Sequence, residues 1–323
     1  MKPRLVLLLL LAALGAYSGT ALAQSFPSKP VRIVVPYPAG GSIDTTARLI
    51  SVKMAEALAQ PVLVENRAGA GARIGQDFVA KATPDGHTIL IDTVSLAISP
   101  ALYRNLPFDA AKDFTPVTRL VGTTLVLAVS PKVQAASVRE LIALAKSKPG
   151  GLNHGHTGVG TSLHMAMELF KLSTGIDILG IPYKGDALVS NALMAGEVDV
   201  AIVTLPSSLQ SVKVGRMRAL GVSSARRTAV LPDVPTIDEA GVSGYEYGAW
   251  QGLYAPSKTP RGIVDMIQRE AAKAINAPEV RDRLLATGLE VIGSTQEEAE
   301  ARYKSDLAKF ARIVREARIP LQD

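Results

Sequence analysis

Two glycine-rich segments carry the residue types best suited to holding a ligand. They span residues 36–44, PYPAGGSID, and residues 156–164, HTGVGTSLH. Each follows an apolar run of strand length and opens a segment of helical period, so N–H groups without intrahelical partners converge where the helix dipole is positive. Glycine allows the backbone there to approach a ligand closely. The two segments are therefore predicted to bind an anionic group such as a carboxylate, a sulfate or a phosphate.

Phosphate fits these segments less well than the other anions do. Neither segment has the lysine that follows the last glycine of a P-loop, and neither has the G-x-G-x-x-G spacing of a dinucleotide site. Residues 69–75, GAGARIG, come closest to that spacing but are one residue too long. A tight turn without any ligand is the alternative interpretation of each segment.

Binding energy explains why two such segments would act together. A charge-assisted hydrogen bond contributes ~1.5–3 kcal/mol, whereas desolvating a carboxylate costs several kcal/mol and association costs roughly 4 or more. The hydrogen bonds from one helix end would only just offset these costs. Four to six donors from two facing segments would leave a net binding free energy of ~8 kcal/mol, which corresponds to a micromolar complex. If the segments belong to different domains, this gain exists only when the domains are closed, so that binding becomes a conformational signal.

Three of the four histidines, His154, His156 and His164, lie close together in the sequence. Zinc is one reading of this group, but no nearby acidic residue is placed to complete a ligand set, and no metal site is predicted. Contact of His156 or His164 with a polar ligand is the second reading. Ordinary hydrogen-bonded histidines are the third.

Catalysis by a serine nucleophile is the main competing hypothesis. Ser42 or Ser162 paired with His164 would make an exported serine hydrolase, although no G-x-S-x-G elbow occurs in the chain. The only tryptophan, Trp250, belongs either to the core or to the wall of a cleft.

The elements that position these segments alternate between β-branched runs and 3.6-period segments, which is typical of an α/β protein with mostly parallel strands. The predicted strands are 31–35, 61–64, 88–91, 124–129, 152–155, 178–181 and 198–203. The predicted helices are 44–58, 72–82, one ending near 148, 161–173 and 186–195. Because the series restarts after residues 149–151, two βα domains of similar plan are expected.

Helix ends are predicted from capping residues. Ser137 with Glu140, and Ser294 with Glu297, have the spacing of capping boxes. Pro260 and Pro278 are each expected at the first position of a helix. Residues 295–317 read as a charged amphipathic helix with a solvated face and no chemistry.

The composition excludes several classes of protein. The chain has 323 residues, of which 47% are hydrophobic and 20% charged, so it is neither disordered nor fibrous. It contains no cysteine, which removes disulfides, thiolate metal sites and a lipid-modified N-terminus. No cluster of Lys and Arg marks a nucleic-acid partner.

The N-terminus has the three parts of a secretory signal peptide. Lys2 and Arg4 precede an apolar run, 5–14, and small residues follow, with cleavage expected after Ala23. A transmembrane anchor is the alternative, but it needs a longer apolar stretch. The mature chain is therefore expected to be exported and free in the periplasm.

Further motifs extend over nearly the whole mature chain. They are residues 34–41 (VVPYPAGG), 64–71 (VENRAGAG), 84–86 (PDG), 106–109 (LPFD), 182–185 (PYKG), 231–236 (LPDVPT) and 252–256 (GLYAP). In this order they resemble the Bug-type receptors of tripartite tricarboxylate transporters.

The resemblance implies a fold, a function and partners. The fold would be the two-domain periplasmic-binding-protein fold, of Venus flytrap, type II-like architecture. Domain 1 would comprise residues 24–122 plus 250–323, and domain 2 would comprise residues 123–249. The function would be capture of a small organic carboxylate and its delivery to membrane transporter subunits, with no enzymatic activity, cofactor or nucleic acid. A sensor kinase is a further partner left open, as is the identity of the carboxylate.

The resemblance also implies the binding residues. Backbone amides and hydroxyls of the two segments would hold one carboxylate, namely those of Ala39, Gly40, Gly41, Ser42, Thr157, Gly158, Gly160 and Thr161. Further contacts are expected from Tyr37, Asp44, Ser95, His156, His164 and Thr204.

The sequence departs from the family pattern near the ligand. His156 stands where relatives more often have serine, and His154 where tyrosine is common. Residues 203–204, Val-Thr, replace a frequent Asp-Asn, and Ser99 replaces a frequent asparagine before Pro100. The far end of the pocket is therefore in doubt, and affinity that depends on pH through His156 is a hypothesis.

Overall fold

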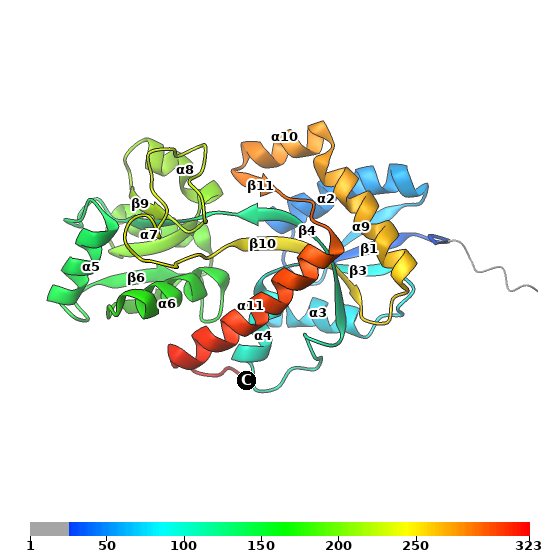
Figure 1. The fold of residues 1–323 in the computed structure, drawn as a ribbon, viewed down its shortest axis with the longest axis horizontal. Helices are drawn as coiled ribbons and strands as arrows, with labels where there is room; N and C mark the ends of the chain where they lie inside the picture. Colours follow the sequence, from blue (N-terminus) through cyan, green and yellow to red (C-terminus); the bar gives the residue numbers. More distant parts are fainter. Residues whose placement is uncertain (1–25) are drawn as a thin grey trace, which may run out of the picture.

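The computed structural model describes residues 26–323 and contains two sheets, each with helices packed on both faces (Figure 1). The six-stranded sheet has the order β11-β4-β10-β3-β1-β2, and the five-stranded sheet has the order β7-β6-β8-β5-β9. We call the two halves of the molecule the six-stranded lobe and the five-stranded lobe. The predicted signal peptide, 1–23, lies outside the described residues.

The strands follow the sequence pattern in most places. They are β1 (Val31–Val35), β2 (Val62–Asn66), β3 (Thr88–Thr93), β4 (Phe114–Thr123), β5 (Leu125–Val129), β6 (Asn153–His156), β7 (Leu179–Pro182), β8 (Val200–Thr204), β9 (Arg218–Val222), β10 (Ala249–Pro256) and β11 (Leu289–Val291). All seven predicted strands are present within a few residues. Strands β4, β9, β10 and β11 were not predicted.

The helices agree equally well. They are α2 (Ser42–Leu58), α3 (Arg73–Ala80), α4 (Ser95–Leu102), α5 (Val138–Ser147), α6 (Ser162–Thr174), α7 (Asp186–Ala195), α8 (Leu205–Lys213), α9 (Arg261–Asn276), α10 (Pro278–Ala286) and α11 (Gln296–Glu316), with a short 3-10 turn at Ala70–Ala72. Helices α4 and α8 were not predicted. The sequence of α4 is short, mostly apolar and contains Pro100, so it shows no clear helical period.

The two-lobed α/β fold class is confirmed, but the expectation of mostly parallel strands is wrong in detail. Strand β1 pairs in parallel with β2 and β3, and β6 pairs in parallel with β7 and β8. Strand β10 is antiparallel to both β3 and β4, and β5 is antiparallel to β8 and β9. The chain leaves the six-stranded sheet through β4, enters the other as β5 and returns through β10, so the strands that cross between the lobes run against their neighbours.

Both faces of the six-stranded sheet are buried because alternate residues of a strand point to opposite sides. Ile33 and Ile89 belong to one apolar cluster with residues of α2 and α9. Val34 and Leu90 belong to another, which includes residues of α4 and α11 and continues into the five-stranded lobe. The lobes therefore share apolar packing on the α11 side.

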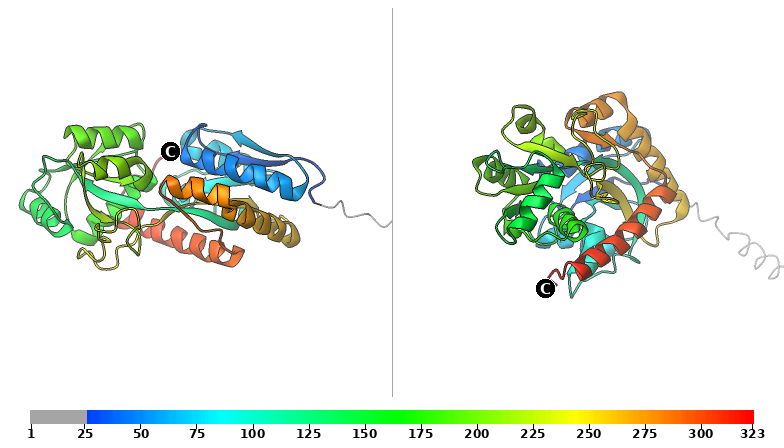
Figure 2. Two further views of the ribbon diagram at one scale, coloured as in Figure 1. Left: turned by 90° about the horizontal axis from the view of Figure 1, so that it is seen from above. Right: turned by 60° about the vertical axis from the view of Figure 1, so that its left-hand side comes forward.

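Helix α11 ties the lobes together, since it packs on α4 and β4 and also contacts α6 (Figures 1 and 2). Trp250 is a core residue, 2% exposed, whose indole Nε1 donates to Asp306 Oδ2 of α11 at 2.7 Å. Arg302 Nε donates to the same carboxylate oxygen at 2.9 Å. The only tryptophan thus anchors α11 to β10.

Two predicted helix starts are displaced by one residue. The capping box of α11 consists of Thr295 and Glu298, so the predicted pair of Ser294 and Glu297 is wrong. The hydroxyl of Ser294 instead accepts from the Arg119 amide at 2.9 Å, which fixes it to β4. Pro260 is the N-cap of α9 and not its first residue, whereas Pro278 does begin α10.

The α11 anchor predicts a large cost for Asp306→Ala. The change leaves the Trp250 N–H and the Arg302 guanidinium without their buried acceptor, and we expect the free energy of unfolding to fall by about 3–5 kcal/mol. Glu300→Ala on the same helix breaks only the exposed pair with Lys304 and should cost about 1 kcal/mol or less. Urea unfolding followed by far-UV circular dichroism measures both, and equal losses in the two variants would contradict the anchor.

Candidate functional site

A cavity of about 440 Å³ lies between the two lobes, and we call it the cleft cavity. Its walls come from α4 and the residues before it on one side and from the segment before α6 on the other. Among the described residues that line it, none carries a formal charge. They are Tyr37, Gly71, Thr93, Ser95, Ile98, Ser99, Leu102, Tyr103, Thr157, Gly158, Val159, Gly160, Thr161, Ser162 and Leu163.

The wall from the six-stranded lobe is organised by the buried carboxylate of Asp92. Tyr37 Oη and Ser95 Oγ both donate to Asp92 Oδ1 at 3.0 Å, and the Thr93 amide donates to the same oxygen at 2.6 Å. Gln76 Nε2 donates to the other carboxylate oxygen at 2.6 Å. Burial raises the pKa of Asp92 to about 6, although the hydrogen bonds from Gln76 and its neighbours oppose the shift. Burial, together with the charge of Asp92, raises the pKa of Tyr37 well above its usual value.

Three hydroxyl groups of this wall, those of Tyr37, Ser95 and Ser99, use their protons inside the protein. Tyr37 and Ser95 give theirs to Asp92, and Ser99 gives its proton to the Ser95 carbonyl at 2.8 Å. Ser95 and Ser99 line the cavity but have no proton left to donate to a ligand, and Ser95 Oγ also lies 2.7 Å from Tyr37 Oη and accepts from Gln76 Nε2 at 3.5 Å. A ligand with a hydrogen-bond donor, such as a hydroxyl or amine group, would therefore complement this wall.

The opposite wall is the segment before α6, whose hydroxyls are also satisfied internally. Thr157 Oγ1 donates to Thr161 Oγ1 at 2.8 Å, and Thr161 Oγ1 donates to the Gly158 carbonyl at 2.8 Å. Thr161 is the N-cap of α6. The segment is thus held in shape before any ligand arrives.

Two backbone N–H groups of this segment donate to the imidazole rings of His156 and His164. The Gly158 N–H donates to His156 Nδ1 at 3.1 Å, and the Gly160 N–H donates to His164 Nδ1 at 3.3 Å. Both rings must be neutral to accept these bonds. Burial lowers the pKa of His156 and lowers that of His164 to about 4, so both are neutral at pH 7. Their role in the structure is to support the loop.

Other amides of the same segment are free. The N–H groups of Val159, Ser162 and Leu163 have no acceptor among residues 26–323. Ser162 and Leu163 are the first two residues of α6, where the helix leaves its amides unpaired and its dipole is positive. All three residues line the cleft cavity. They are the donors that could hold an anion.

The first glycine-rich segment has the same hydrogen bond as the second, from a glycine N–H to the side chain of the third residue of the following helix. Asp44, the third residue of α2, accepts from the Gly40 N–H at 2.9 Å, just as His164, the third residue of α6, accepts from Gly160. Both glycines have positive φ, +89° and +78° respectively. The two helices thus begin with equivalent turns, one in each lobe, which no sequence repeat reveals.

Asp44 is therefore a structural carboxylate. Burial alone would raise its pKa, but hydrogen bonds from Arg48, Gly40 and Asn66 prevail and lower it. Residues 39–42 are exposed and do not line the cleft cavity. Ser42 Oγ accepts from Gln251 Nε2 of β10 at 3.0 Å.

The predicted site residues fall into two groups. The cleft cavity brings together Tyr37, Ser95, Thr157, Gly158, Gly160 and Thr161. It does not include Ala39, Gly40, Gly41, Ser42, Asp44, His156, His164 and Thr204. Thr204 caps α8, and its hydroxyl donates to Asp186 Oδ2 at 2.6 Å.

Sequence reasoning predicted Ser95 but missed the rest of the wall that α4 provides. Ile98, Leu102 and Tyr103 line the cavity, and Thr93 ends the strand before them. The signal that could have found Thr93 is its position at the carboxyl end of a parallel strand, where α/β proteins bind ligands. Helix α4 itself has no such signal.

The arrangements that zinc or hydrolase chemistry would need are not formed. The His156 ring lies 5.5 Å from His154 and 4.7 Å from His164, centroid to centroid, yet no group of three metal-ligating side chains is found in residues 26–323. No hydrogen bond joins Ser42 or Ser162 to His164 in that part of the chain, and Ser162 Oγ lies 3.3 Å from Tyr247 Oη. Burial lowers the pKa of His154 to about 3, so this ring is also neutral.

The two lobes and the cavity between them define a solute-binding protein, and the comparisons with known proteins agree. Residues 46–319 match the family model described as the tripartite tricarboxylate transporter family receptor. The chain therefore belongs to that receptor family. Within the described residues, no helix has both the length and the apolarity that crossing a membrane requires.

Relatives with this fold include proteins with bound carboxylates. The chain is 33% identical to Protein BugT of Bordetella pertussis over 95% of this chain and 97% of BugT. The structure described as R. palustris Rpa4515 with adipate is 33% identical, with a TM-score of 0.80 over 92% of this chain and 100% of that one. MatC from Rhodopseudomonas palustris with bound malate is 31% identical, with a TM-score of 0.77 over 90% of this chain and 100% of that one.

The raised pKa of Asp92 predicts a specific pH dependence of stability. Between its ordinary value of 3.8 and about 6, the folded protein binds a proton that the unfolded chain has released. The contribution of this carboxyl to the free energy of unfolding is therefore largest below the lower value and falls as the pH rises through the upper one. The unfolding free energy of the wild type, measured relative to that of Asp92→Asn, should therefore fall by on the order of 3 kcal/mol from about pH 4 to about pH 7. Urea titrations at each pH test this, and a constant difference would mean that Asp92 titrates normally.

Proposed function

We propose that this protein is a periplasmic receptor that binds a small organic carboxylate between its lobes and delivers it to the membrane subunits of a tripartite transporter. The signal peptide is cleaved after Ala23, and the two domains are residues 24–122 with 250–323 and residues 123–249. The observation that carries the proposal is an uncharged cavity between the lobes with free N–H groups at the start of a helix.

The carboxylate group is held by the amides at the start of α6. The N–H groups of Val159, Ser162 and Leu163 are unpaired and reach the cleft cavity, so an anion there gains charge-assisted hydrogen bonds without competing with an internal acceptor. The adipate and malate bound by two relatives support the assignment of a carboxylate. The amides of Gly40, Gly158 and Gly160, which were expected to contact the ligand, instead shape the turns.

The opposite wall narrows the class of carboxylate. Ser95 and Ser99 have oxygens whose protons are bound inside the protein, by the buried Asp92 carboxylate for Ser95 and by the Ser95 carbonyl for Ser99. A ligand with a hydroxyl or amine group can donate to these oxygens, whereas a purely aliphatic acid leaves the Ser99 oxygen desolvated and without a donor. Ile98, Leu102 and Leu163 supply the apolar surface for the body of the ligand. We therefore propose a hydroxy or amino acid, closer to malate in chemistry than to adipate.

Matched acids that differ only in the hydroxyl group test this ligand class. We expect malate to bind more tightly than succinate, and 2-hydroxyisocaproate more tightly than 4-methylpentanoate, by about tenfold, because one hydrogen bond is gained. Isothermal titration calorimetry on the mature protein measures both pairs. Equal affinities within a pair would remove the donor requirement and leave the receptor function standing. Failure of a broad panel of carboxylic acids to bind would contradict the receptor function itself.

The contact between the lobes predicts the effect of Gly160→Ala. A Cβ at this position would lie 1.9 Å from Leu102 Cδ2 of the other lobe, so either the Leu102 side chain, which lines the cleft cavity, or the lobe that carries it must move. We expect carboxylate affinity to fall by about 100-fold or more, since two or more of the hydrogen bonds need a closed cleft.

Gly175→Ala is the matched control for this change. Gly175 ends α6 with φ of +65°, close to the +78° of Gly160, but no heavy atom lies within 4 Å of the place that its methyl group would occupy. Both variants therefore carry the same backbone strain, and only one blocks the cleft. Thermal unfolding midpoints should drop equally, while calorimetry should show normal binding only for Gly175→Ala. Normal binding by Gly160→Ala would show that the ligand does not need this contact.

A further inference from the structure

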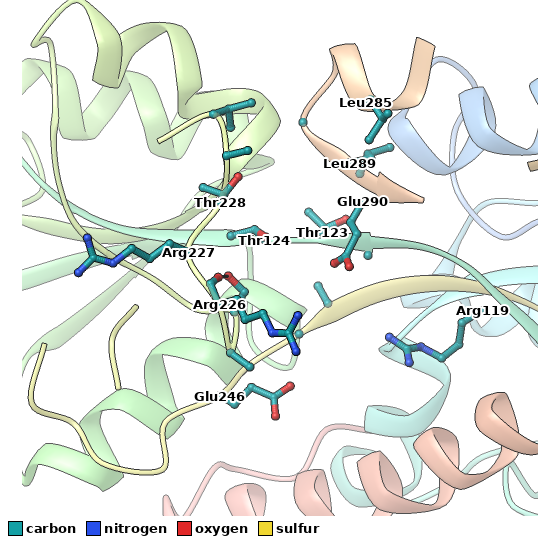
Figure 3. Close-up of a pocket in the computed structure, with 18 of the residues that line it drawn as sticks. Arg119, Thr123, Thr124, Arg226, Arg227, Thr228, Glu246, Leu285, Leu289 and Glu290 are labelled. Atoms are coloured by element: carbon teal, nitrogen blue, oxygen red, sulfur yellow. Dashed lines mark hydrogen bonds between the residues drawn. The ribbon is translucent and has the colours of Figure 1, made fainter. Parts of the chain in front are cut away.

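A second cavity, of about 570 Å³, lies where the chain crosses between the lobes, and we call it the crossing cavity (Figure 3). It shares no lining residue with the cleft cavity. Its walls come from β4 and β11 of the six-stranded lobe, from the 224–230 loop that follows β9 of the five-stranded lobe, and from the 246–249 segment that leads into β10. In contrast to the cleft cavity, it is rich in charge.

Two of its arginines have no carboxylate partner in the described part of the chain. Arg227 is bonded to Glu239 at 2.8 Å, and Arg302 is bonded to Asp306 and Glu246. Arg119 and Arg226 form no such pair. Both side chains point into the crossing cavity from opposite sides in Figure 3.

Arg119 is the more constrained of the two. It is partly buried, and its Nε is a fully buried donor with no acceptor. Its guanidinium lies 5.6 Å from the ring of Trp250 and close to the positive charge of Arg302, and burial followed by that charge lowers its pKa. A bound anion would accept from the terminal N–H groups of this guanidinium and offset the repulsion.

Glu290 limits which anion fits. Its carboxylate points into the cavity between the two arginines in Figure 3, and it forms no ion pair within residues 26–323. An oxyanion without protons would be repelled by this carboxylate, whereas one that keeps an O–H group can donate to it.

We propose that the crossing cavity binds an oxyanion that retains a proton, a phosphoryl group held by Arg119 and Arg226 and donating to Glu290. Free phosphate keeps such an O–H group at neutral pH, whereas a phosphate monoester, whose second pKa is about 6, has it only in its minor singly charged form. Sulfate has the same shape but no proton to donate at neutral pH. The carboxylate ligand of the cleft is not involved.

Calorimetric titration of the mature protein at constant ionic strength tests the site. Inorganic phosphate should bind with a dissociation constant in the millimolar range and sulfate at least about tenfold more weakly, because sulfate lacks the donor. Phosphate binding should also change the emission of Trp250, which lies beside Arg119. Titration with glycerol phosphate separates the sources: tighter binding than phosphate assigns the site to esters, and weaker binding assigns it to the free ion.

Variants make the assignment specific. Arg119→Gln and Arg226→Gln should each weaken phosphate by about tenfold or more, whereas Arg312→Gln, an exposed arginine of α11 that lines neither cavity, should not. Glu290→Gln should bring sulfate to within about twofold of phosphate, because the repulsion is removed. Carboxylate binding in the cleft should be unchanged in all four.

Equal binding of phosphate and sulfate by the wild type would overturn the proposal, as would phosphate binding that survives both arginine changes. The exposed Arg226 provides a variant that should fold normally if Arg119→Gln does not.

Discussion

Unpaired backbone N–H groups at the start of α6 are the feature on which this account of the receptor depends. They face a cavity in which no described residue carries a charge, so an anion must be held by dipoles and hydrogen bonds alone. Three such bonds contribute roughly 5–9 kcal/mol before the costs of association and desolvation. These amides all belong to one lobe, whereas Ser95 and Ser99 belong to the other, so a ligand contacts both walls only when the cleft is closed.

The turns that present these amides are stabilised by side chains of their own helices. Asp44 and His164 occupy the same position in α2 and α6 and each accepts from the amide of a glycine with positive φ. The chemical difference between them matters. His164 lies behind the anion site and is neutral because burial lowers its pKa, whereas Asp44 is a carboxylate balanced by Arg48. A carboxylate in place of His164 would oppose an anion in the cleft, so the neutral imidazole provides the same bond without the repulsion.

Local pattern predicted much of the fold, and the remainder depended on contacts that no local pattern encodes. The βα units were visible because β-branched runs and helical periods alternate, and the turn at Gly160 was visible because glycine marks it. Helix α4 was invisible because both its faces are buried and Pro100 interrupts it. The antiparallel crossing strands could not be foreseen either, since their direction is set by where the chain changes lobes.

The binding site was likewise predicted only in part from local sequence patterns. Sequence spacing identified the two turns, but hydrogen-bond donors at Gly158 and Gly160 are used by His156 and His164, and only coordinates reveal which amides remain free. Asp92 was also hidden, because a single carboxylate at the end of an apolar strand has no motif. Its effect is to set the direction of the hydroxyls in one wall of the cleft.

The most direct test of the central claim is the amide spectrum of the ¹⁵N-labelled protein during titration with malate. The amide protons of Val159, Ser162 and Leu163 should move downfield as they begin to donate to a carboxylate, while those of Gly158 and Gly160 should keep their bonds to the imidazoles. Saturable binding that leaves the first three resonances in place would contradict the account.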